Sequence, residues 1–337
     1  MKHNVNEVKR MLLAGDIGGT KTLLGLFDTE TVRPRALVVR SYGTLDFDDL
    51  PSMIRLFLAD GEAPRAPLDC AAFGVAGPVL GDSATLTNVP WRVEARRVGE
   101  AFNVRRVQLL NDLEAMAWSI PVLRESEVHV LQEGVARRGG NIALIAAGTG
   151  LGQALLHWVT DRFVPSASEG GHADFAARTD REIELVRMLR DIYGRAEVEQ
   201  VLSGPGLLNL HRFTHRGGQC TVVDDLGAPD APARISQSAL GGRCQFCVEA
   251  LRMFVSAYGA EAGNLALRGV ATAGVYVGGG IAPKILRAMQ DGSFIEAFGA
   301  KPPMSDLLSR MPVKVILKPD AGLLGAAVYA QSLLASA

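Results

Sequence analysis

Short apolar runs that end at glycine-rich turns are the main pattern along this chain. Residues 11–16 form an apolar run, a glycine turn covers 17–21, and a second apolar run covers 22–28. Short apolar runs bounded by turn residues are typical of strands, so the segment predicts a strand, a turn and a strand. The same pattern recurs at 141–158, which predicts two related halves that face one another.

The other periodic segments alternate between strands and helices. We expect further strands at 35–41, 70–76 and 106–110, and helices at 47–60, 112–119, 180–193, 196–202, 206–214, 243–267 and 283–291. The polar, proline-containing stretch 216–234 predicts an exposed loop, and no low-complexity linker separates independent domains. The chain is therefore expected to be α/β, as one large domain or two moderate ones.

Composition narrows the class of protein. The 337 residues are 48% apolar, which is ample for a buried core, and 35 basic against 36 acidic side chains give a net charge of −1. Without a broad cationic face, nucleic acid is not expected as a partner. Charges are scattered through the first residues, and glycines and polar residues break the most apolar stretch, 142–159. We therefore expect no secretory signal, no membrane partner and a cytoplasmic location.

Four cysteines in a chain of this length do not indicate a disulfide framework. Cys244 and Cys247 form a CxxC, the one spacing that suggests zinc. They stand at the start of a predicted helix, and no second CxxC or histidine pair is apparent that would complete four ligands. The expectation from the sequence is two ordinary helical thiols.

The first glycine turn, in GDIGGTKT, resembles the phosphate loop of P-loop enzymes. That loop needs a second glycine five residues after the first and a helix directly behind it, but position 20 is threonine and an apolar run follows. A tight hairpin can still hold phosphate, because the backbone N–H groups of Gly18 and Gly19 can approach an anion and Thr20 adds a hydroxyl. Asp16 could hold Mg²⁺ through water, or the segment could serve only as a turn.

Two later turns share this chemistry. Residues 147–152, AGTGLG, form another bend with small side chains and a hydroxyl, and two such hairpins could bind a polyphosphate from both sides. At 275–286 a strand runs into Gly278-Gly279-Gly280 and then a helix. Close backbone approach at such a strand-to-helix turn suits a base or a ribose.

Asn111 and Asp112 follow a predicted strand and precede a predicted helix. The carboxyl ends of strands are where open α/β sheets place ligands, so Asp112 could be a general base that takes a proton from an attacking hydroxyl. The alternative is a helix N-cap, a role that aspartate and asparagine fill well.

A second group of polar residues suits a polyol. Glu169 and His172 flank two glycines in SEGGHADF, so a carboxylate and an imidazole could turn toward one ligand. A metal site is the rival, but only Asp174 is a nearby third ligand and the spacing matches no common zinc pattern. Glu199, in AEVEQVLSGPG, has by itself the pattern of a solvated helical glutamate.

Nearly the whole chain, from about 11 to 330, resembles bacterial ATP-dependent glucokinases. The motifs occur in the order, and at about the spacing, of that family; they are GDIGGT, FGVAGPV with LTNVPW, LLNDLEAMA, AGTGLG, SEGGHADF, VLSGPGLLNL, VGGGIAPK and AGLLGAA. The resemblance implies an actin-like ATPase (ribonuclease H-like) α/β fold with a cleft between two domains. The small domain would be 1–122 plus 320–337, and the large domain 123–319.

The resemblance also implies roles for single residues. Asp112 would be the catalytic base for the 6-hydroxyl of glucose. The implied glucose ligands are Asn111, Asp112, Glu169, His172 and Glu199. The implied nucleotide-binding residues are Gly15, Asp16, Ile17, Gly18, Gly19 and Thr20 in the first turn, Thr149 and Gly150 in the second, and Gly279 and Gly280 near the adenosine. We expect ATP and Mg²⁺, with Asp16 near the metal, and a homodimer.

Lys21 is a departure from the glucokinase pattern. It makes the first loop GGTK, as in the related ROK family of sugar kinases and repressors, where glucokinases of the matched group often have asparagine. The cysteine-rich zinc motif of the ROK family is absent, and only some ten residues precede the first loop, which disfavours a DNA-binding repressor. The expected activity is phosphorylation of D-glucose at O6. The alternatives are a ROK-like kinase for another hexose or amino sugar, or an inactive sugar sensor.

Overall fold

The chain divides into two compact units in the computed structural model, which describes residues 10–29, 32–61, 66–86, 89–216, 218, 220 and 222–335. Unit 1 comprises Met1–Arg124 and Asp320–Ala337, and unit 2 comprises Glu125–Pro319. Both units are built around mixed sheets with helices packed on them. The C-terminal helix thus returns to the unit that the N-terminal segment begins.

Unit 1 contains a five-stranded sheet with the order β3-β2-β1-β4-β8. Its strands are β1 (Met11–Ile17), β2 (Lys21–Asp28), β3 (Arg35–Gly43), β4 (Leu68–Val75) and β8 (Arg106–Asn111). Strands β1, β4 and β8 run parallel, with Ile17 beside Val75 and Val75 beside Asn111. The carboxyl ends of these three strands therefore meet at one edge of the sheet, where open α/β sheets bind ligands.

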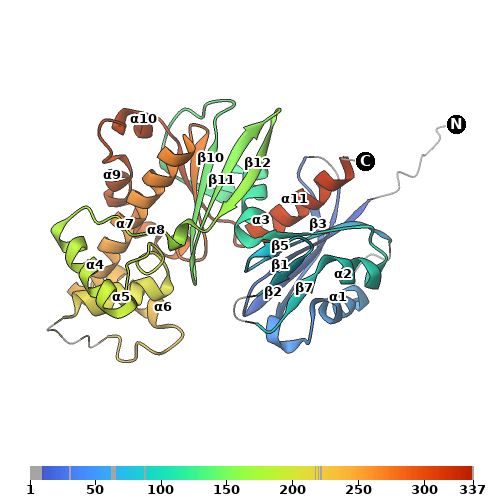
Figure 1. The fold of residues 1–337 in the computed structure, drawn as a ribbon, viewed down its shortest axis with the longest axis horizontal. Helices are drawn as coiled ribbons and strands as arrows, with labels where there is room; N and C mark the ends of the chain where they lie inside the picture. Colours follow the sequence, from blue (N-terminus) through green and yellow to red (C-terminus); the bar gives the residue numbers. More distant parts are fainter. Residues whose placement is uncertain are drawn as a thin grey trace. The chain divides into compact units, whose positions relative to one another are not determined.

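Helices cover both faces of this sheet (Figure 1). Leu13 and Phe73 point to the face covered by α1 (Leu50–Ala59) and α2 (Ala95–Phe102). Leu12 and Ala72 point to the opposite face, against α11 (Ala321–Ala335). Burial of alternate residues on both faces makes β1 and β4 continuous apolar runs, as expected for central strands. A small sheet of β5 (Val79–Leu80), β6 (Ser83–Thr85) and β7 (Arg92–Glu94) completes the unit's strands among the described residues.

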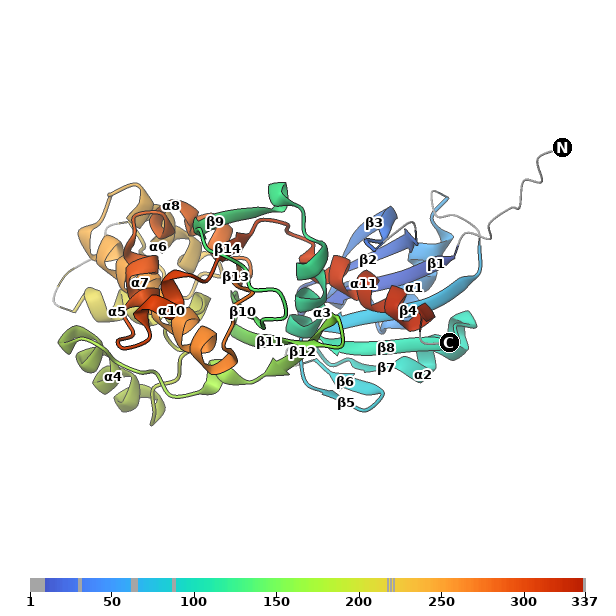
Figure 2. The same cartoon turned by 90° about the horizontal axis from the view of Figure 1, so that it is seen from above.

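Unit 2 contains a six-stranded sheet with the order β12-β11-β10-β13-β14-β9, which can be followed strand by strand in Figure 2. Its strands are β9 (Val128–Gln132), β10 (Ile142–Ala147), β11 (Leu151–Val159), β12 (Arg162–Ser168), β13 (Gly274–Gly278) and β14 (Val313–Ile316). The hairpin β10–β11 is antiparallel, whereas β13 runs parallel to β10. Both β10 and β13 consequently end at the same edge.

The helices of unit 2 bury the largest apolar cluster of the described residues. They are α4 (Asp180–Tyr193), α5 (Gly204–Thr214), α6 (Ala231–Leu240), α7 (Gln245–Gly269), α8 (Leu286–Met289), α9 (Ser293–Gly299) and α10 (Ser305–Ser309). Helix α7 is buried along most of its length because β10 packs on it as well as α5, α6 and α9. None of the helices that the structure describes combines the length and apolar run needed to cross a membrane.

The strand–turn–strand predictions at both glycine turns are confirmed, but three other predictions were wrong in whole or in part. Residues 196–202 are not helical, because 196–198 pairs with 173–175 and 199–201 form a turn: Phe175 N donates to Ala196 O, and Val198 N donates to Ala173 O. Seven residues are too few for periodicity to separate a helix from such a segment. The predicted loop 216–234 also ends early, because α6 begins at Ala231. The segment 283–291 holds only a 3₁₀ turn and the short α8.

Candidate active site

The first glycine turn is a hairpin between antiparallel strands. Gly15, Asp16 and Ile17 end β1, the turn is Gly18-Gly19-Thr20, and β2 follows at once. Gly18 N donates to Lys21 O at 3.1 Å. Thr44, in the 3₁₀ turn Thr44–Asp46 that follows β3, supports the glycine turn: its Oγ1 donates to Gly18 O at 2.8 Å and its N donates to Thr20 O. Because no helix follows the turn, the rejection of a P-loop is confirmed.

Asp16 stands at the carboxyl end of β1 beside two other carboxylates. Its pKa is raised from 3.8 to about 6, mainly by burial and then by the negative charges of Asp112 and Asp320, while the positive charge of Lys21 opposes this shift. A Cβ at Gly322 would lie 2.7 Å from Asp16 Oδ2, so the first turn of α11 closes directly over this carboxyl. The edge of the sheet is thus a concentrated site of negative charge that a cation would stabilise.

Asp112 is the first residue of α3 (Asp112–Ser119), at the carboxyl end of β8. The N-cap role that the sequence left open belongs to Asn111, whose Oδ1 accepts from Leu113 N at 2.9 Å. Asp112 Oδ1 also accepts from this N–H, at 2.8 Å. The start of a helix favours an ionised carboxylate electrostatically, which suits a base that must be deprotonated before it acts.

The second glycine turn, in unit 2, is held by Glu199. Gly148 N donates to Gly150 O at 2.8 Å, which closes the bend between β10 and β11. Glu199 Oε2 accepts from Leu151 N at 2.8 Å and would lie 2.6 Å from a Cβ at Gly150. Glu199 is therefore a half-buried carboxylate that lies in a turn of its own and supports the second glycine turn. The sequence reading of it as a helical surface residue was wrong.

The third glycine turn lies directly against the second. Gly279 has φ +84°, and a Cβ there would lie 2.3 Å from Ala147 O, so this position requires glycine. Tyr258 joins the ends of β10 and β13, because its hydroxyl accepts from Ala147 N at 3.0 Å and lies 3.3 Å from Gly278 O. Burial raises the pKa of this fully enclosed phenol. Thr149-Gly150 and Gly279-Gly280 are thus parts of one edge of the unit 2 sheet.

His172 belongs to a chain of charged groups on the same unit. Its Nδ1 lies 2.9 Å from Glu197 Oε2, and Arg195 Nη2 lies 2.7 Å from Glu197 Oε1. The hydrogen bond to Glu197 raises the pKa of His172, and His172 and Arg195 lower that of Glu197. Glu169 precedes the 3₁₀ turn Gly170–His172 and is exposed, and its charge also favours the protonated imidazole.

The two groups of candidate residues thus form one cluster in each unit. In unit 1 the sheet edge gathers Asp16, Asn111 and Asp112. In unit 2 the pairing of 171–175 with 196–199 brings Glu199 N to Gly171 O at 2.9 Å, beside the second turn. Sequence reasoning missed Asp320, Glu197 and Tyr258. The alternation of acidic residues in AEVEQ is a signal for Glu197, whereas Asp320 and Tyr258 have no local signal.

Comparisons with known proteins agree on one family. A family model described as Glucokinase matches residues 13–333. A glucokinase of Nostoc sp. is 37% identical over 341 residues, covering 96% of this chain and 99% of the relative. The crystal structure of a glucokinase from an Antarctic psychrotroph superposes with a TM-score of 0.86 at 30% identity, covering 96% and 99% of the two chains.

A more distant solved structure shows the fold alone. It is a ROK family glucokinase from Streptomyces griseus in complex with glucose and AMPPNP, with a TM-score of 0.64 at 22% identity, covering 96% of this chain and 99% of that one. The α/β architecture is accordingly that of actin-like ATPases, as predicted. With a matched model over almost the entire length and full-length relatives above 30% identity, this chain belongs to the glucokinase family.

Proposed function

We propose that Asp112 is the general base in transfer of the γ-phosphoryl group of ATP to the 6-hydroxyl of D-glucose, which gives glucose 6-phosphate and ADP. The chain is an ATP-dependent hexose kinase by its family. The observation that carries the assignment is the position of Asp112 at the carboxyl end of β8, at the start of α3. Among the described site residues, Asp320 also stands at the start of a helix, α11, but residues 317–319 separate it from the end of β14.

The reaction makes limited chemical demands on the protein. Phosphoryl transfer is accelerated mainly by positioning and by neutralisation of charge, and the base only has to accept the proton of the attacking hydroxyl. Asp112 would accept the proton of the 6-hydroxyl while this oxygen attacks the γ-phosphorus. The bond between the γ-phosphorus and the oxygen that leaves with ADP would break in the same step. Asn111 would hold a neighbouring sugar hydroxyl with its side-chain amide.

The nucleotide would be held by backbone groups. The turns Gly18–Thr20 and Gly148–Gly150 offer N–H groups and threonine hydroxyls to phosphate oxygens. Gly279 and Gly280 would lie near the adenosine, where the space beside Gly280 is open: a Cβ there would meet nothing within 4 Å. The glucose and AMPPNP in the Streptomyces structure support the same pair of substrates for this chain.

The sugar would be bound by Glu169, His172 and Glu199 in unit 2. A polyol presents both donors and acceptors, and these side chains supply carboxylate acceptors together with an imidazole whose Nδ1 is already engaged by Glu197. That engagement leaves Nε2 of His172 for the ligand. We also propose residues 1–122 plus 320–337 as the small domain and residues 123–319 as the large domain.

Magnesium fits the unit 1 edge. Burial and the repulsion between Asp16 and the carboxylates of Asp112 and Asp320 raise the pKa of Asp16. A bound Mg²⁺ ion would offset this repulsion, and it could keep several of its water ligands. Asp16 would hold the ion through water. When bound, the ion would neutralise charge on the phosphate oxygens. The cytoplasmic location is proposed from the charge and hydrophobicity pattern of the sequence, and the homodimer from the resemblance. Sedimentation of the purified protein would test the homodimer.

An assay that couples ADP release to glucose addition tests the activity. We expect ADP release that requires both glucose and Mg²⁺. Comparison of kcat/KM for glucose, mannose, fructose and N-acetylglucosamine then tests the substrate, and a higher value for any other sugar would contradict glucose as the preferred acceptor. Absence of turnover with all four sugars, despite saturable binding of glucose, would instead identify a sugar sensor.

A further inference from the structure

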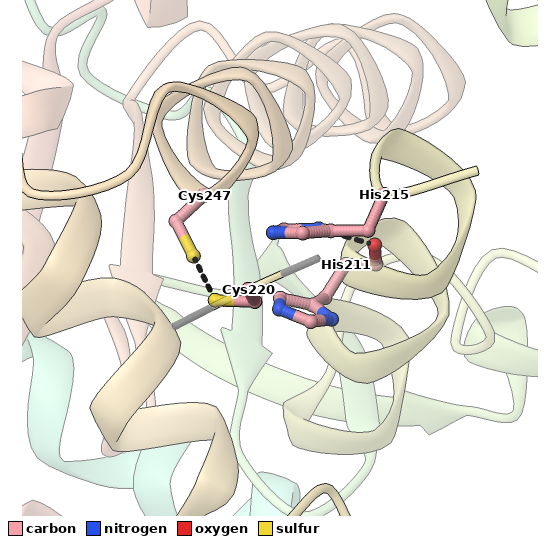
Figure 3. A group of neighbouring side chains, drawn as sticks. All are labelled: His211, His215, Cys220 and Cys247. Carbon is pink, nitrogen blue, oxygen red and sulfur yellow. Dashed lines mark hydrogen bonds between the residues drawn. The ribbon is translucent and has the colours of Figure 1, made fainter. Parts of the chain in front are cut away.

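Three of the chain's four cysteines and two of its six histidines lie together in unit 2, away from the glycine turns. Cys220 lies in the segment after α5, whereas Cys244 and Cys247 stand at the start of α7. His211 belongs to the last turn of α5, and His215 is the C-cap residue that follows the helix (Figure 3). The remaining cysteine, Cys70, belongs to β4 in unit 1. The cluster therefore joins three segments that are separate in the sequence.

His211 and His215 form a histidine pair that the sequence-based expectation did not include. His211 and His215 are four residues apart, a spacing that places both side chains on one face of a helix. The rings stack with centroids 3.7 Å apart. Cys244 and Cys247 add the CxxC spacing that is common in zinc sites. The fold brings His215 and Cys220 beside Cys244, which the expectation of two ordinary helical thiols did not include.

Three distances between the donor atoms are close to the edges of a tetrahedron around zinc. Zn–S bonds near 2.3 Å and Zn–N bonds near 2.0 Å require edges of about 3.8 Å between two sulfurs and about 3.6 Å between sulfur and nitrogen. Cys220 Sγ lies 3.8 Å from Cys247 Sγ and 4.0 Å from Cys244 Sγ. Cys244 Sγ lies 3.4 Å from His215 Nε2. Disulfides would instead require sulfurs about 2.05 Å apart.

The tautomer of His215 is set for coordination. Its Nδ1 lies 2.8 Å from the backbone O of His211, which can only accept, so Nδ1 carries the proton. Nε2 is then the unprotonated nitrogen, and it is the atom that faces Cys244. A ligating histidine that donates its other N–H to a carbonyl is the usual outer arrangement of a zinc site.

His211 is the other histidine of the cluster. Its side chain is buried, with 4% of the residue exposed, and neither ring nitrogen has a hydrogen-bond partner among the described residues. A buried polar atom without a partner costs about 1–3 kcal/mol. Donor atoms of His211, His215, Cys220 and Cys247 all lie within 4.8 Å of one another, so a metal ion in this cluster would also stand beside His211.

We propose that Cys220, Cys244, Cys247 and His215 bind one structural Zn²⁺ ion. Cys244 is preferred to His211 as the fourth ligand because its contacts with Cys220 and His215 have the length of tetrahedral edges. Four protein ligands leave no open position for substrate, so the ion would be structural. The ion would join the end of α5 and Cys220 to the start of α7. Helix α5 also contacts the second glycine turn, because Gly204 N, at the start of α5, donates to Gly148 O.

Zinc content of the protein, purified without a polyhistidine tag or chelator, tests the site. We expect about one zinc per chain, and at least about a tenfold loss of zinc in Cys220→Ser and Cys247→Ser. Cys70→Ala is the matched control and should keep the wild-type zinc content, because Cys70 lies in the other unit. Absence of zinc from the wild-type protein would overturn the proposal. Retention of the wild-type zinc content by both Cys220→Ser and Cys247→Ser would overturn it as well.

Cobalt keeps the test independent of whether the variants fold. The wild-type chain, stripped by a chelator and reloaded with Co²⁺, should show thiolate-to-cobalt charge transfer and the intense ligand-field bands of a tetrahedral site. Weak bands typical of octahedral cobalt would contradict the cysteine ligands. His211→Phe should retain zinc and Cys244→Ser should lose it. The reverse result would overturn the assignment of Cys244.

Discussion

Glu199 Oε2 accepts a hydrogen bond from the backbone N–H of Leu151 at 2.8 Å, and this contact joins a proposed sugar ligand to the second glycine turn. The carboxylate also lies directly against Gly150, where an added Cβ would be 2.6 Å from it. A side chain that shapes the phosphate turn with one oxygen can contact the sugar with the other. Recognition of the two substrates is therefore expected to be coupled at this residue.

Substitution of Glu199 should separate its two roles. Glu199→Gln keeps an acceptor for Leu151 N–H but removes the charge, so we expect KM for glucose to rise by about 10- to 100-fold, with KM for ATP little changed. Glu199→Ala leaves that N–H without its partner and should also lower the free energy of unfolding by about 1–3 kcal/mol. Steady-state kinetics and urea unfolding measure these effects. Equal behaviour of both variants would contradict a separate role in the turn.

Removal of the carboxylate of Asp112 should abolish most of the turnover. Asp112→Asn keeps the size of the side chain but cannot accept the sugar's proton, so kcat should fall by about 10²–10⁴-fold. Binding of ATP, measured by calorimetry, should persist because the nucleotide-binding turns are intact. Near-normal kcat in Asp112→Asn would remove Asp112 from the role of general base.

Asp16 should make stability depend on pH. Because its pKa is raised to about 6 in the folded protein, the folded state holds this proton more tightly than the unfolded state does. Stability is therefore lost as pH rises from about 4 to about 6, and the ionised group costs up to about 3 kcal/mol above that range.

Asp16→Asn should remove this cost. The free energy of unfolding in the absence of Mg²⁺ should be higher than that of the wild type at pH 8, and the difference should disappear near pH 4. Urea titrations at both pH values give the comparison. The same difference between the two proteins at pH 4 and pH 8 would show that ionisation of Asp16 is not its source.

Alanine substitutions at Gly279 and Gly280, two neighbouring residues of the third glycine turn, should have different effects on stability. Gly279→Ala puts a Cβ against Ala147 O at a residue with φ +84°, so the free energy of unfolding should fall by about 1–3 kcal/mol or more. Gly280→Ala meets nothing within 4 Å and should leave this free energy within about 0.5 kcal/mol of the wild type. Chemical denaturation of both variants measures the free energy of unfolding. An equal loss of this free energy in Gly279→Ala and Gly280→Ala would contradict the prediction.

The sequence predicted the parts of the candidate site whose conformation depends on neighbouring residues. The end of β1 at Asp16 and the start of α3 at Asp112 follow from apolar runs, turn residues and a helix boundary, which all act over a few positions. Segment 196–202 failed because its conformation comes from pairing with 171–175, a partner that local periodicity does not reveal. Asp320 and Tyr258 were missed for the same reason.

By itself, the sequence determined the glycine turns and the strands around them, because backbone sterics and the burial period act within single elements. The ordered set of motifs also carried the resemblance to the family. Only the tertiary structure decided which side chains meet. The parallel register of β1, β4 and β8 sets Asp16 at the same edge as Asp112, and α11 returns Asp320 to it. Packing of α5 against α7 likewise brings His215 to Cys244, since contacts between distant segments depend on how whole elements pack.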